Sequence, residues 1–444
     1  MSTPGTTPVP TADEGPHDPY GALRLPAFRW FIVSLMAMTI GVQIQGIAVA
    51  WQLYAATNDP LALGLAGLAE VLPFLALSLP AGQWADRHDR KRLALIGIGA
   101  LVLCAALFLA MTIGLHARVS STTHGVGVGV GSTSWSSPLV IYAVLAVSGV
   151  ARAILQPARQ ALGTMIVPAS LYANAATWRS STWQLASVVG PAVGGLLFAL
   201  SGPIITYAVT LALLLLAFWG MSVVQAPPRV ITPRAATDGA GILEGVRFVL
   251  RDKLVLAALS LDMFAVLFGG ATALLPVFTS TVLHVSPEWL GYLRAAPAVG
   301  AVCMALVIAH QPAMDNAGRT LLLAVATWGL SIIGFALSRN VWLSCALLAM
   351  GGAVDSVSVV IRSTLLQSRT PPHVMGRVMA VNSIFIGSAN EIGAFESGLT
   401  ARLLGAVNSV LLGGVATLMV VASMAIFSPT LRRLKRLHGP AAAN

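Results

Sequence analysis

Residues 61–115 read LALGLAGLAEVLPFLALSLPAGQWADRHDRKRLALIGIGALVLCAALFLAMTIGL, two apolar runs separated by one short charged stretch at 82–92. Each run is long enough for a helix to cross the hydrocarbon core of a bilayer, which takes about 20 apolar residues. The charged stretch between them is too polar and too short to do so. This segment therefore predicts two membrane-spanning helices joined by a tight, basic turn.

The same alternation runs through the whole chain of 444 residues. The chain is 56% hydrophobic and 9% charged, whereas soluble domains carry about 25% charged residues. A net charge of +10 would suggest nucleic-acid binding in a soluble protein, but a chain this apolar needs a lipid bilayer around it, so no nucleic-acid partner is expected. We predict an all-α membrane protein whose transmembrane helices cover 28–55, 61–83, 93–115, 138–160, 172–200, 203–224, 254–282, 288–309, 320–337, 341–363, 376–402 and 407–428.

These twelve transmembrane helices divide into two six-helix bundles, 28–224 and 254–428, joined by a cytoplasmic linker at 225–253. The tail 1–27 is rich in Thr and Pro and is expected to be disordered. Residues 429–444 form a short basic tail suited to anionic headgroups.

The distribution of the 26 Lys and Arg residues predicts the orientation. Most of them fall on the side that holds both termini, and only Arg118, Arg339 and Arg402 fall on the other side. Because cytoplasmic loops carry the excess of Lys and Arg, both termini are expected in the cytoplasm, with the chain in a plasma or bacterial inner membrane.

An internal repeat relates the two bundles and predicts pseudo-symmetry between them. One constant shift superposes Gly149, Arg159, Pro168, Gly190 and Gly195 on Gly352, Arg362, Pro371, Gly393 and Gly398. A second, larger shift superposes Pro60 and Gly64 on Pro287 and Gly291. The length of the loop at 120–138, which carries a GVGVGVG run, accounts for the difference between the two shifts.

The basic turn is the most specific motif in the chain, and we interpret it as a gating loop made of Gly82, Asp86, Arg87, Asp89, Arg90, Lys91 and Arg92. Gly82 would let another helix approach closely, and Asp86 could accept hydrogen bonds from a facing helix N terminus. The alternative is an ordinary turn with positive-inside charge. The motif resembles the signature loop of the major facilitator superfamily, in which Asp89 is usually glycine.

Other phrases resemble the drug and siderophore exporter branch of that superfamily: NDPLALG at 58–64, PAR at 157–159, LLP at 274–276 and GRV at 376–378. The resemblance implies a proton-coupled exporter of small amphipathic molecules that works by alternating access. In that branch an acid often follows a glycine in the first transmembrane helix, but here Gly41 is followed by Val42 and Gln43.

A glycine and proline motif in the fifth transmembrane helix, Gly190, Pro191, Gly194 and Gly195, resembles the antiporter motif of exporting subfamilies. Small residues four apart permit tight helix contact, and the proline would provide a bend. Packing alone is the alternative explanation.

Charged residues inside a membrane are costly, so each is a functional candidate. Burial favours the neutral form of a carboxyl group, which then binds and releases a proton near neutral pH. Our order of candidates for proton coupling is Asp355, Glu391, Glu70 and Asp262, of which Asp262 is the one most suited to a gate or cap. The alternative is that they form static ion pairs with cations of the cavity. The remaining cavity charge candidates are Arg152, Arg179, Arg294 and Glu396.

A polar wall for an amphipathic substrate is expected from Gln43, Gln45, Gln184, Asn382 and Asn390. The chain has no phosphate-binding loop, no histidine pair at metal-ligand spacing and no nucleophile constellation, so we predict neither an ATPase, a metal site nor an enzyme. No cofactor beyond the proton is expected, and the protein is expected to be monomeric. The rival interpretations are an importer or facilitator on the same fold and, from another class, a membrane-embedded enzyme or sensor.

Overall fold

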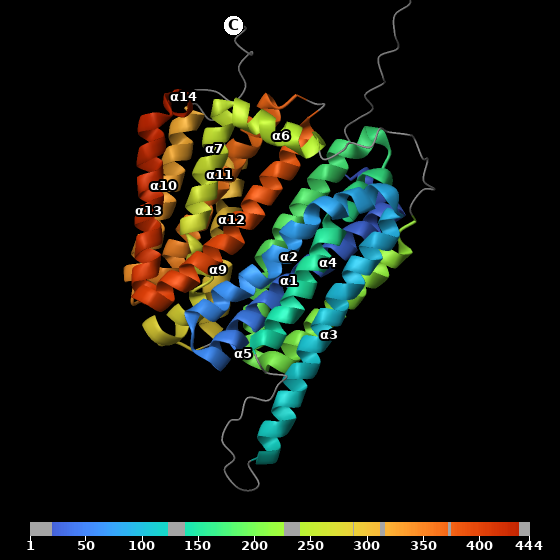
Figure 1. Cartoon of the computed structure of the whole chain (residues 1–444), viewed down its shortest axis with the longest axis vertical. Coiled ribbons are helices and arrows are strands. Elements are labelled where there is room, and N and C mark those ends of the chain that lie inside the picture. Colours follow the sequence, from blue (N-terminus) through green and yellow to red (C-terminus); the bar gives the residue numbers. More distant parts are fainter. Residues whose placement is uncertain are drawn as a thin grey trace, which may run out of the picture.

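The protein is a helical bundle in two parts, which lie side by side (Figure 1). The computed structural model describes residues 20–122, 138–225, 240–286, 288–310, 316–371 and 374–434, although a few helical side chains, including those of Asp86 and Gln184, are not described. Every regular element in these ranges is a helix. The N-terminal half contains η1 (Ala22–Arg24), α1 (Pro26–Thr57), α2 (Pro60–Arg87), α3 (Arg90–Thr122), α4 (Pro138–Met165), η2 (Ala169–Leu171) and α5 (Tyr172–Val223).

The C-terminal half has the same number of membrane-crossing segments and several short helices around them. Its elements are α6 (Ala240–Arg251), α7 (Lys253–Phe268), η3 (Gly270–Thr272), α8 (Leu275–Val277), η4 (Phe278–Val282), α9 (Glu288–Ala309), α10 (Ala317–Leu337), α11 (Val341–Arg369), α12 (Met375–Leu404), α13 (Ala406–Phe427) and α14 (Pro429–Arg432). The predicted all-α membrane fold with twelve transmembrane helices in two bundles is confirmed.

Ten helical segments of the described chain are long and apolar enough to cross a membrane. One of them, within α5, contains two of the predicted transmembrane helices. Their junction is Gly202, whose φ of 73° and ψ of −179° suit glycine alone. The α12 helix is outside the ten, and its charged residues Arg377, Glu391, Glu396 and Arg402 make it less apolar than its neighbours.

Side chains at the loops start several of these helices. Asp59 accepts a hydrogen bond from Leu61 N at 3.0 Å, directly before Pro60 at the first position of α2. Asn340 accepts from Trp342 N at 2.9 Å at the start of α11. These caps satisfy amide groups that have no partner inside the helix, so the helix boundaries are specified locally.

The transmembrane segment predicted over 254–282 is found as one apolar segment, Lys253–Val282, but its backbone leaves the α-helix between α7 and α8. Gly269 and Gly270 lie at the break, and a β-carbon on Gly270 would come within 2.7 Å of Gly393 O on α12. Pro276 follows and has no amide hydrogen to donate. Close packing of α12 and the missing amide together account for the interruption.

Helical structure extends into the predicted linker and into the predicted N-terminal tail. Within the linker 225–253, α6 occupies the second part and packs Val249 into a cluster with Val255 and Val378. The N-terminal tail also ends earlier than predicted, since Ala22 is fully buried and its amide donates to Asn174 Oδ1 at 3.1 Å. The remaining predicted tail and loop segments, 1–19, 123–137, 226–239 and 435–444, lie outside the described residues.

The residues that define the repeat also define how the halves pack. Gly149 on α4 lies against the backbone of Glu70 on α2, and its counterpart Gly352 on α11 lies against the backbone of Pro297 on α9. The helix pairs α2·α4 and α9·α11 are therefore equivalent contacts. The predicted pseudo-symmetry thus extends to individual helix contacts.

The same repeat generates the contact between the halves, where α5 meets α9 and α2 meets α12. Gly195 packs on Gly291, and Gly398 packs on Gly64 with 3.1 Å between a β-carbon built on Gly398 and Gly64 Cα. These four glycines are the two repeat pairs. Gly64 lies near the start of α2, at the opposite end of that helix from the basic turn, and Gly398 lies near the end of α12, so the halves meet there backbone to backbone.

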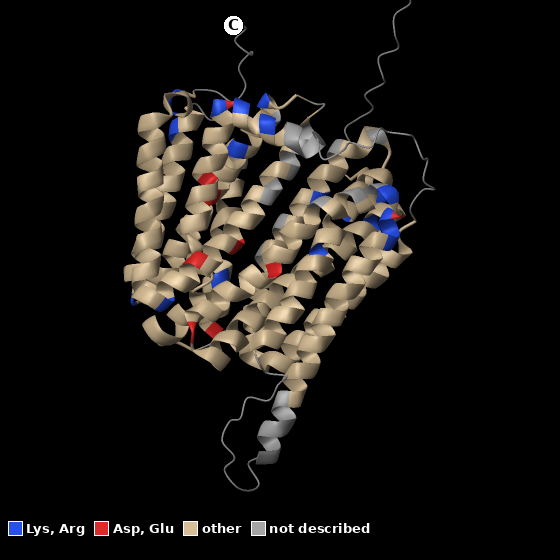
Figure 2. Ribbon diagram, viewed as in Figure 1, with Lys and Arg blue, Asp and Glu red and all other residues tan. Residues whose placement is uncertain are grey.

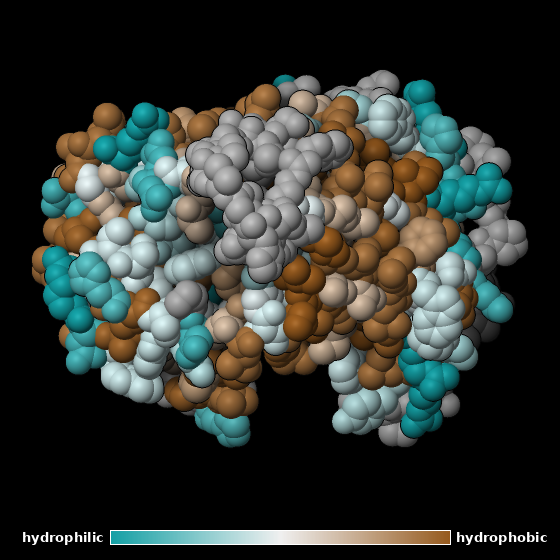
Figure 3. Space-filling model, turned by 90° about the horizontal axis from the view of Figure 1, so that it is seen from below, coloured by the Kyte–Doolittle hydropathy of each residue, from teal (hydrophilic) through white to brown (hydrophobic). Residues whose placement is uncertain are grey.

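Charge and hydropathy distinguish the two ends of the bundle. Lys and Arg gather at the end from which the C terminus leaves (Figure 2). The opposite end has brown, apolar residues over much of its middle and teal, hydrophilic residues mostly toward its margins (Figure 3). We call the end opposite the C terminus the less basic end, and the glycine contacts between the halves lie toward it.

Replacing Gly291 by Ala should hinder closure of this end. The new β-carbon would lie 2.7 Å from Gly195 Cα, and backbone cannot move aside as a side chain can. We expect a cost of about 1–3 kcal/mol against the closed arrangement, as in other overpacked contacts. Spin-label distances between the outer ends of α5 and α9 should lengthen, whereas Gly46→Ala, where a β-carbon would meet no atom within 4 Å, should leave them unchanged. Equal distances in both variants would contradict this role.

Candidate functional site

The basic turn between α2 and α3 ties the ends of four helices of the N-terminal half together. Asp89 Oδ1 accepts from Lys91 N at 2.8 Å and from Arg92 N at 3.3 Å, so Asp89 caps α3. Lys91 Nζ donates to Ser222 O at 2.7 Å, near the end of α5. A cation at a helix C terminus is favourable there. Asp89 therefore has a structural reason to stand where the superfamily usually has glycine.

The remaining residues of the predicted gating loop differ in their contacts and in their exposure. Arg90 Nη1 contacts Met165 Sδ at 2.9 Å, at the end of α4, while Arg87 and Arg92 are exposed. A β-carbon on Gly82 would meet none of the described atoms within 4 Å in this conformation. The predicted partner of Asp86 lies outside the described side chains. The contacts described for Asp89, Arg90 and Lys91 all lie within the N-terminal half.

Glu70 and Arg152 form an ion pair in the middle of the N-terminal half. Arg152 Nη1 lies 2.6 Å from Glu70 Oε1, and Ser148 Oγ donates to the same oxygen at 3.2 Å. The side chain of Arg152 is 44% exposed and that of Glu70 is 19% exposed. The alternative of a static pair therefore describes Glu70 well, and Arg152 remains accessible beside it.

Glu391 brings a charge from the other half to this pair. Its Oε2 lies over Gly67 of α2, where a β-carbon would come within 2.6 Å of it. Glu70, Arg152 and Arg294 all lie close enough to Glu391 to interact with it electrostatically. Arg294 in turn donates to Thr272 O at 2.7 Å, in the broken segment before α8. The predicted candidates Glu391, Glu70, Arg152 and Arg294 thus form one charge cluster across the contact between α2 and α12.

Asp262 has a different environment, inside the C-terminal half. It pairs directly with Arg362 of α11, and the two side chains are 8% and 7% exposed. Asp262 is not a helix cap, because it lies within α7 and Asp252 caps that helix by accepting from Leu254 N at 2.9 Å. Asp262 is a partner in a buried pair.

Asp355 lines a cavity of about 220 Å³ in the C-terminal half. The cavity is bounded by α7, the break after it, α9, α10, α11 and α12, and its wall also includes Asp262, Trp328, Ser358 and Asn390. Among the described residues, Asp355 has no cation within ion-pair distance. It therefore differs from both Glu70 and Asp262, which are paired.

Of the five amides predicted to line a cavity, Asn390 does so. Gln45 is only 5% exposed and its Oε1 has no described partner, while Gln43 lies against Gly190 of α5. These two glutamines pack within the N-terminal half and are not part of the cavity that Asn390 lines. Asn382 has a buried Oδ1 without a described partner, and the side chain of Gln184 is outside the described set.

The glycine and proline motif of α5 serves two contacts. Gly190 and Gly194 pack on α1 at Gln43 and Ile44, and Gly195 packs on α9. The backbone angles stay helical through Pro191, and the non-helical angles within α5 are those of Gly202, the junction between its two transmembrane helices. The two remaining charge candidates are Glu396, which accepts from Ser397 Oγ at 3.4 Å, and Arg179, which lies beside Gly163 of α4.

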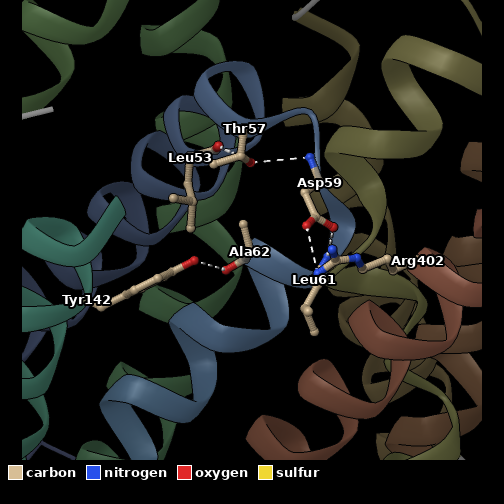
Figure 4. A network of polar contacts seen from close by, with 7 residues as sticks. All are labelled: Leu53, Thr57, Asp59, Leu61, Ala62, Tyr142 and Arg402. Atoms are coloured by element: carbon tan, nitrogen blue, oxygen red, sulfur yellow. Dashed lines mark hydrogen bonds and ion pairs between the residues drawn. The ribbon is translucent and has the colours of Figure 1, made fainter. Parts of the chain in front are cut away.

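Sequence reasoning missed an ion pair between the halves at the less basic end. Asp59 Oδ2 lies 3.3 Å from Arg402 of α12, while the other carboxylate oxygen caps α2 (Figure 4). Thr57 Oγ1 accepts from Asp59 N at 3.3 Å and so fixes the turn that presents the carboxylate. The predicted topology places both residues on the outer side of the membrane, which makes a pair between them possible. Only the fold shows that they are neighbours.

Arg402→Ala should weaken the closed arrangement slightly and in a salt-dependent way. The two side chains are 55% and 33% exposed, and exposed pairs contribute about 0–1 kcal/mol. Distances between spin labels on α2 and on α12, measured at low and at high salt, would report the separation of the two helices. Arg339→Ala, which removes another cation at the same end, is the matched control and should have no effect. An equal shift in both variants would show that the pair is irrelevant.

Comparisons with known proteins agree with this architecture. The family model described as Major Facilitator Superfamily matches residues 31–394. The chain is 26% identical over 428 residues to the multidrug efflux pump Tap of Mycolicibacterium fortuitum, covering 92% of this chain and 98% of that protein. It is 25% identical over 420 residues to the enterobactin exporter EntS of Escherichia coli O1:K1 / APEC, covering 93% and 94%.

Solved structures give the same fold. The crystal structure of a POT family transporter in complex with thioalcohol conjugated peptide aligns with a TM-score of 0.66 at 12% identity, covering 91% of this chain and 96% of that chain. Since the family model covers most of the residues and the related proteins are transporters, the chain is a multi-pass membrane transporter and not an enzyme. It belongs to the major facilitator superfamily.

Proposed function

We propose that the protein is a proton-coupled exporter that moves small amphipathic molecules out of the cytoplasm by alternating access. The observation that carries this proposal is the position of Glu391, a carboxylate of one half held against Gly67 of the other half and close to Arg152. No other cofactor is needed, and each chain holds a complete site, so a monomer suffices.

The position of Glu391 supports proton coupling because the groups around it belong to both halves. Its environment therefore changes when the two halves move relative to each other. At the closed contact between α2 and α12, Glu391 is removed from water and faces the Glu70 carboxylate of α2 as well as Arg152. Burial and repulsion by Glu70 both oppose a charge on Glu391, so protonation favours the closed contact and ionisation favours separation of the halves. Proton binding and conformation are linked in this way, and linkage acts equally in both directions.

The distribution of charge supports an orientation with both termini in the cytoplasm. Lys and Arg gather at the end that carries the C terminus (Figure 2), as the positive-inside rule requires of a cytoplasmic face. The halves meet through glycines and the Asp59–Arg402 pair at the other end. In this orientation the conformation is closed toward the outside.

Export of amphipathic molecules agrees with the related proteins and with the cavity. One relative is named a multidrug efflux pump and another an enterobactin exporter. The cavity of this chain combines apolar side chains such as Val266 and Ile332 with carboxylate, hydroxyl and amide groups. Such a wall suits molecules that have both an apolar body and a polar end.

Inverted membrane vesicles test the proposal. Compounds to which a deletion strain becomes hypersensitive should accumulate in energised inverted vesicles that contain the protein, and an uncoupler should abolish that accumulation. Accumulation that survives the uncoupler in the absence of ATP would overturn proton coupling. Accumulation only in right-side-out vesicles would favour the importer or facilitator on the same fold.

A further inference from the structure

We infer that the C-terminal half carries a binding site for a protonated amine, in the cavity bounded by α7, α9, α10, α11 and α12. The inference rests on the proposed function, because the site would hold the cationic end of an exported amphipathic molecule. Every residue in the cavity wall belongs to the C-terminal half, and the four members of the charge cluster, Glu70, Arg152, Arg294 and Glu391, are not among them.

The charge of the cavity favours a cation. Asp262 and Asp355 both line it, and Arg362 neutralises Asp262 by direct pairing. Asp355 has no cationic partner among the described residues. The other arginine near the wall, Arg294, is held by Thr272 O and interacts with Glu391. One carboxylate is therefore left for a ligand.

A buried hydroxyl supplies the second, independent observation. Ser358 lies one turn after Asp355 on α11, it is 2% exposed, and it lines the same cavity. Its Oγ has no hydrogen-bond partner in the described structure. A buried polar group without a partner destabilises the fold, so a ligand that supplies the missing hydrogen bond would be favoured.

The polar atoms offered to the cavity are mainly acceptors. Asn390 uses its Nδ2 to donate to Ile386 O at 2.9 Å in its own helix, which leaves Oδ1 as the free end of the amide. Together with the Asp355 carboxylate and the Ser358 hydroxyl, this arrangement matches the several N–H donors of a primary or secondary ammonium.

An aromatic face completes the site. Trp328 lines the cavity, and its indole lies against Gly269, a position where the absence of a β-carbon makes room for the ring. A tryptophan face attracts cations. The cavity volume of about 220 Å³ is below the roughly 300–1,000 Å³ of drug-sized pockets. The site therefore fits a small amine or the ammonium end of a larger molecule.

Titration of phenethylammonium into the full-length protein, purified in detergent at neutral pH, tests the inference by calorimetry. The neutral 2-phenylethanol, which has the same carbon chain, and the anionic 3-phenylpropanoate serve as controls. We expect saturable binding of the ammonium, at least about tenfold tighter than that of the alcohol, because hydrogen bonds to charged groups are stronger than neutral ones. Equal binding of the ammonium and the alcohol would overturn the proposal without any variant.

Two variants locate the binding. Asp355→Asn should weaken ammonium binding about tenfold or more, whereas Glu288→Gln, which removes an exposed carboxylate at the start of α9, should not.

Ser358→Ala should weaken binding severalfold and leave the melting temperature unchanged or raised. Ser363→Ala, whose hydroxyl donates to Val360 O in the same helix, should change neither. Unaltered affinity in both Asp355→Asn and Ser358→Ala would contradict the site.

The titrations use no proton gradient, so they separate this inference from the proposed function. Selective ammonium binding with no proton-driven transport would refute the exporter proposal and keep the site. Proton-driven transport without selective ammonium binding would refute the site and keep the exporter. If Asp355→Asn fails to fold, the comparison of the three probes on the unaltered protein still decides.

Discussion

Glu391→Gln should abolish transport driven by a proton gradient while substrate counterflow continues. The amide has nearly the shape of the carboxyl group and keeps the contact with Gly67, but it neither binds a proton nor attracts Arg152 as an ion. Counterflow needs only the exchange of substrate between the two orientations. Uptake into inverted vesicles, measured with a gradient and by counterflow, separates the two activities.

The matched control for this variant is Glu288→Gln, which replaces an exposed carboxylate in the first turn of α9. It should retain both activities. Loss of counterflow as well as gradient-driven transport in Glu391→Gln would indicate a role in folding or substrate binding. Full gradient-driven transport in that variant would remove Glu391 from the mechanism.

Arg362→Met should destabilise the protein by about 3–5 kcal/mol, since removing one member of a buried ion pair leaves the other charge uncompensated. Asp262 would then be an unpaired carboxylate that is 8% exposed, inside the membrane-spanning part of the C-terminal half. Lower yield and a lower unfolding midpoint in detergent would measure the loss. The effect should exceed that of Arg152→Met, because the Arg152 side chain is 44% exposed and is partly solvated.

The double variant Asp262→Leu/Arg362→Met is the internal control. Replacing both charges by apolar groups of similar size is often neutral or stabilising, so most of the lost stability should return. Arg319→Met, which removes an exposed cation of α10, should have little effect. A double variant that is as unstable as Arg362→Met would show that packing around Arg362, and not charge, determines the loss.

The predictable part of the fold was the part determined by local hydrophobicity and by the repeat. Apolar runs specified the membrane-spanning helices, and the repeat pairs Gly195–Gly398 and Gly64–Gly291 turned out to be the residues at which the halves touch. The break after α7 was not predictable from hydrophobicity, because the segment is apolar throughout. It depends on the approach of Gly393 O to Gly270, which is a tertiary contact.

The candidate charges could be named from sequence, but their partners could not. Asp262, Asp355, Glu70 and Glu391 all have the same signature, an acid within an apolar run. The fold separates them, since Asp262 and Glu70 are paired, Asp355 lines a cavity and Glu391 reaches the other half. Which acid has which neighbours depends on helix rotation and packing across the bundle, and the sequence pattern alone does not specify either.

Proton movement recorded during transport is the most direct test of the central claim. The purified protein would be placed in proteoliposomes that enclose a pH-sensitive dye, and a compound identified in the susceptibility screen would be added. The account predicts a substrate-dependent proton flux opposite to the movement of substrate in the unaltered protein, and no such flux in Glu391→Gln. Substrate transport without proton flux in the unaltered protein would contradict it.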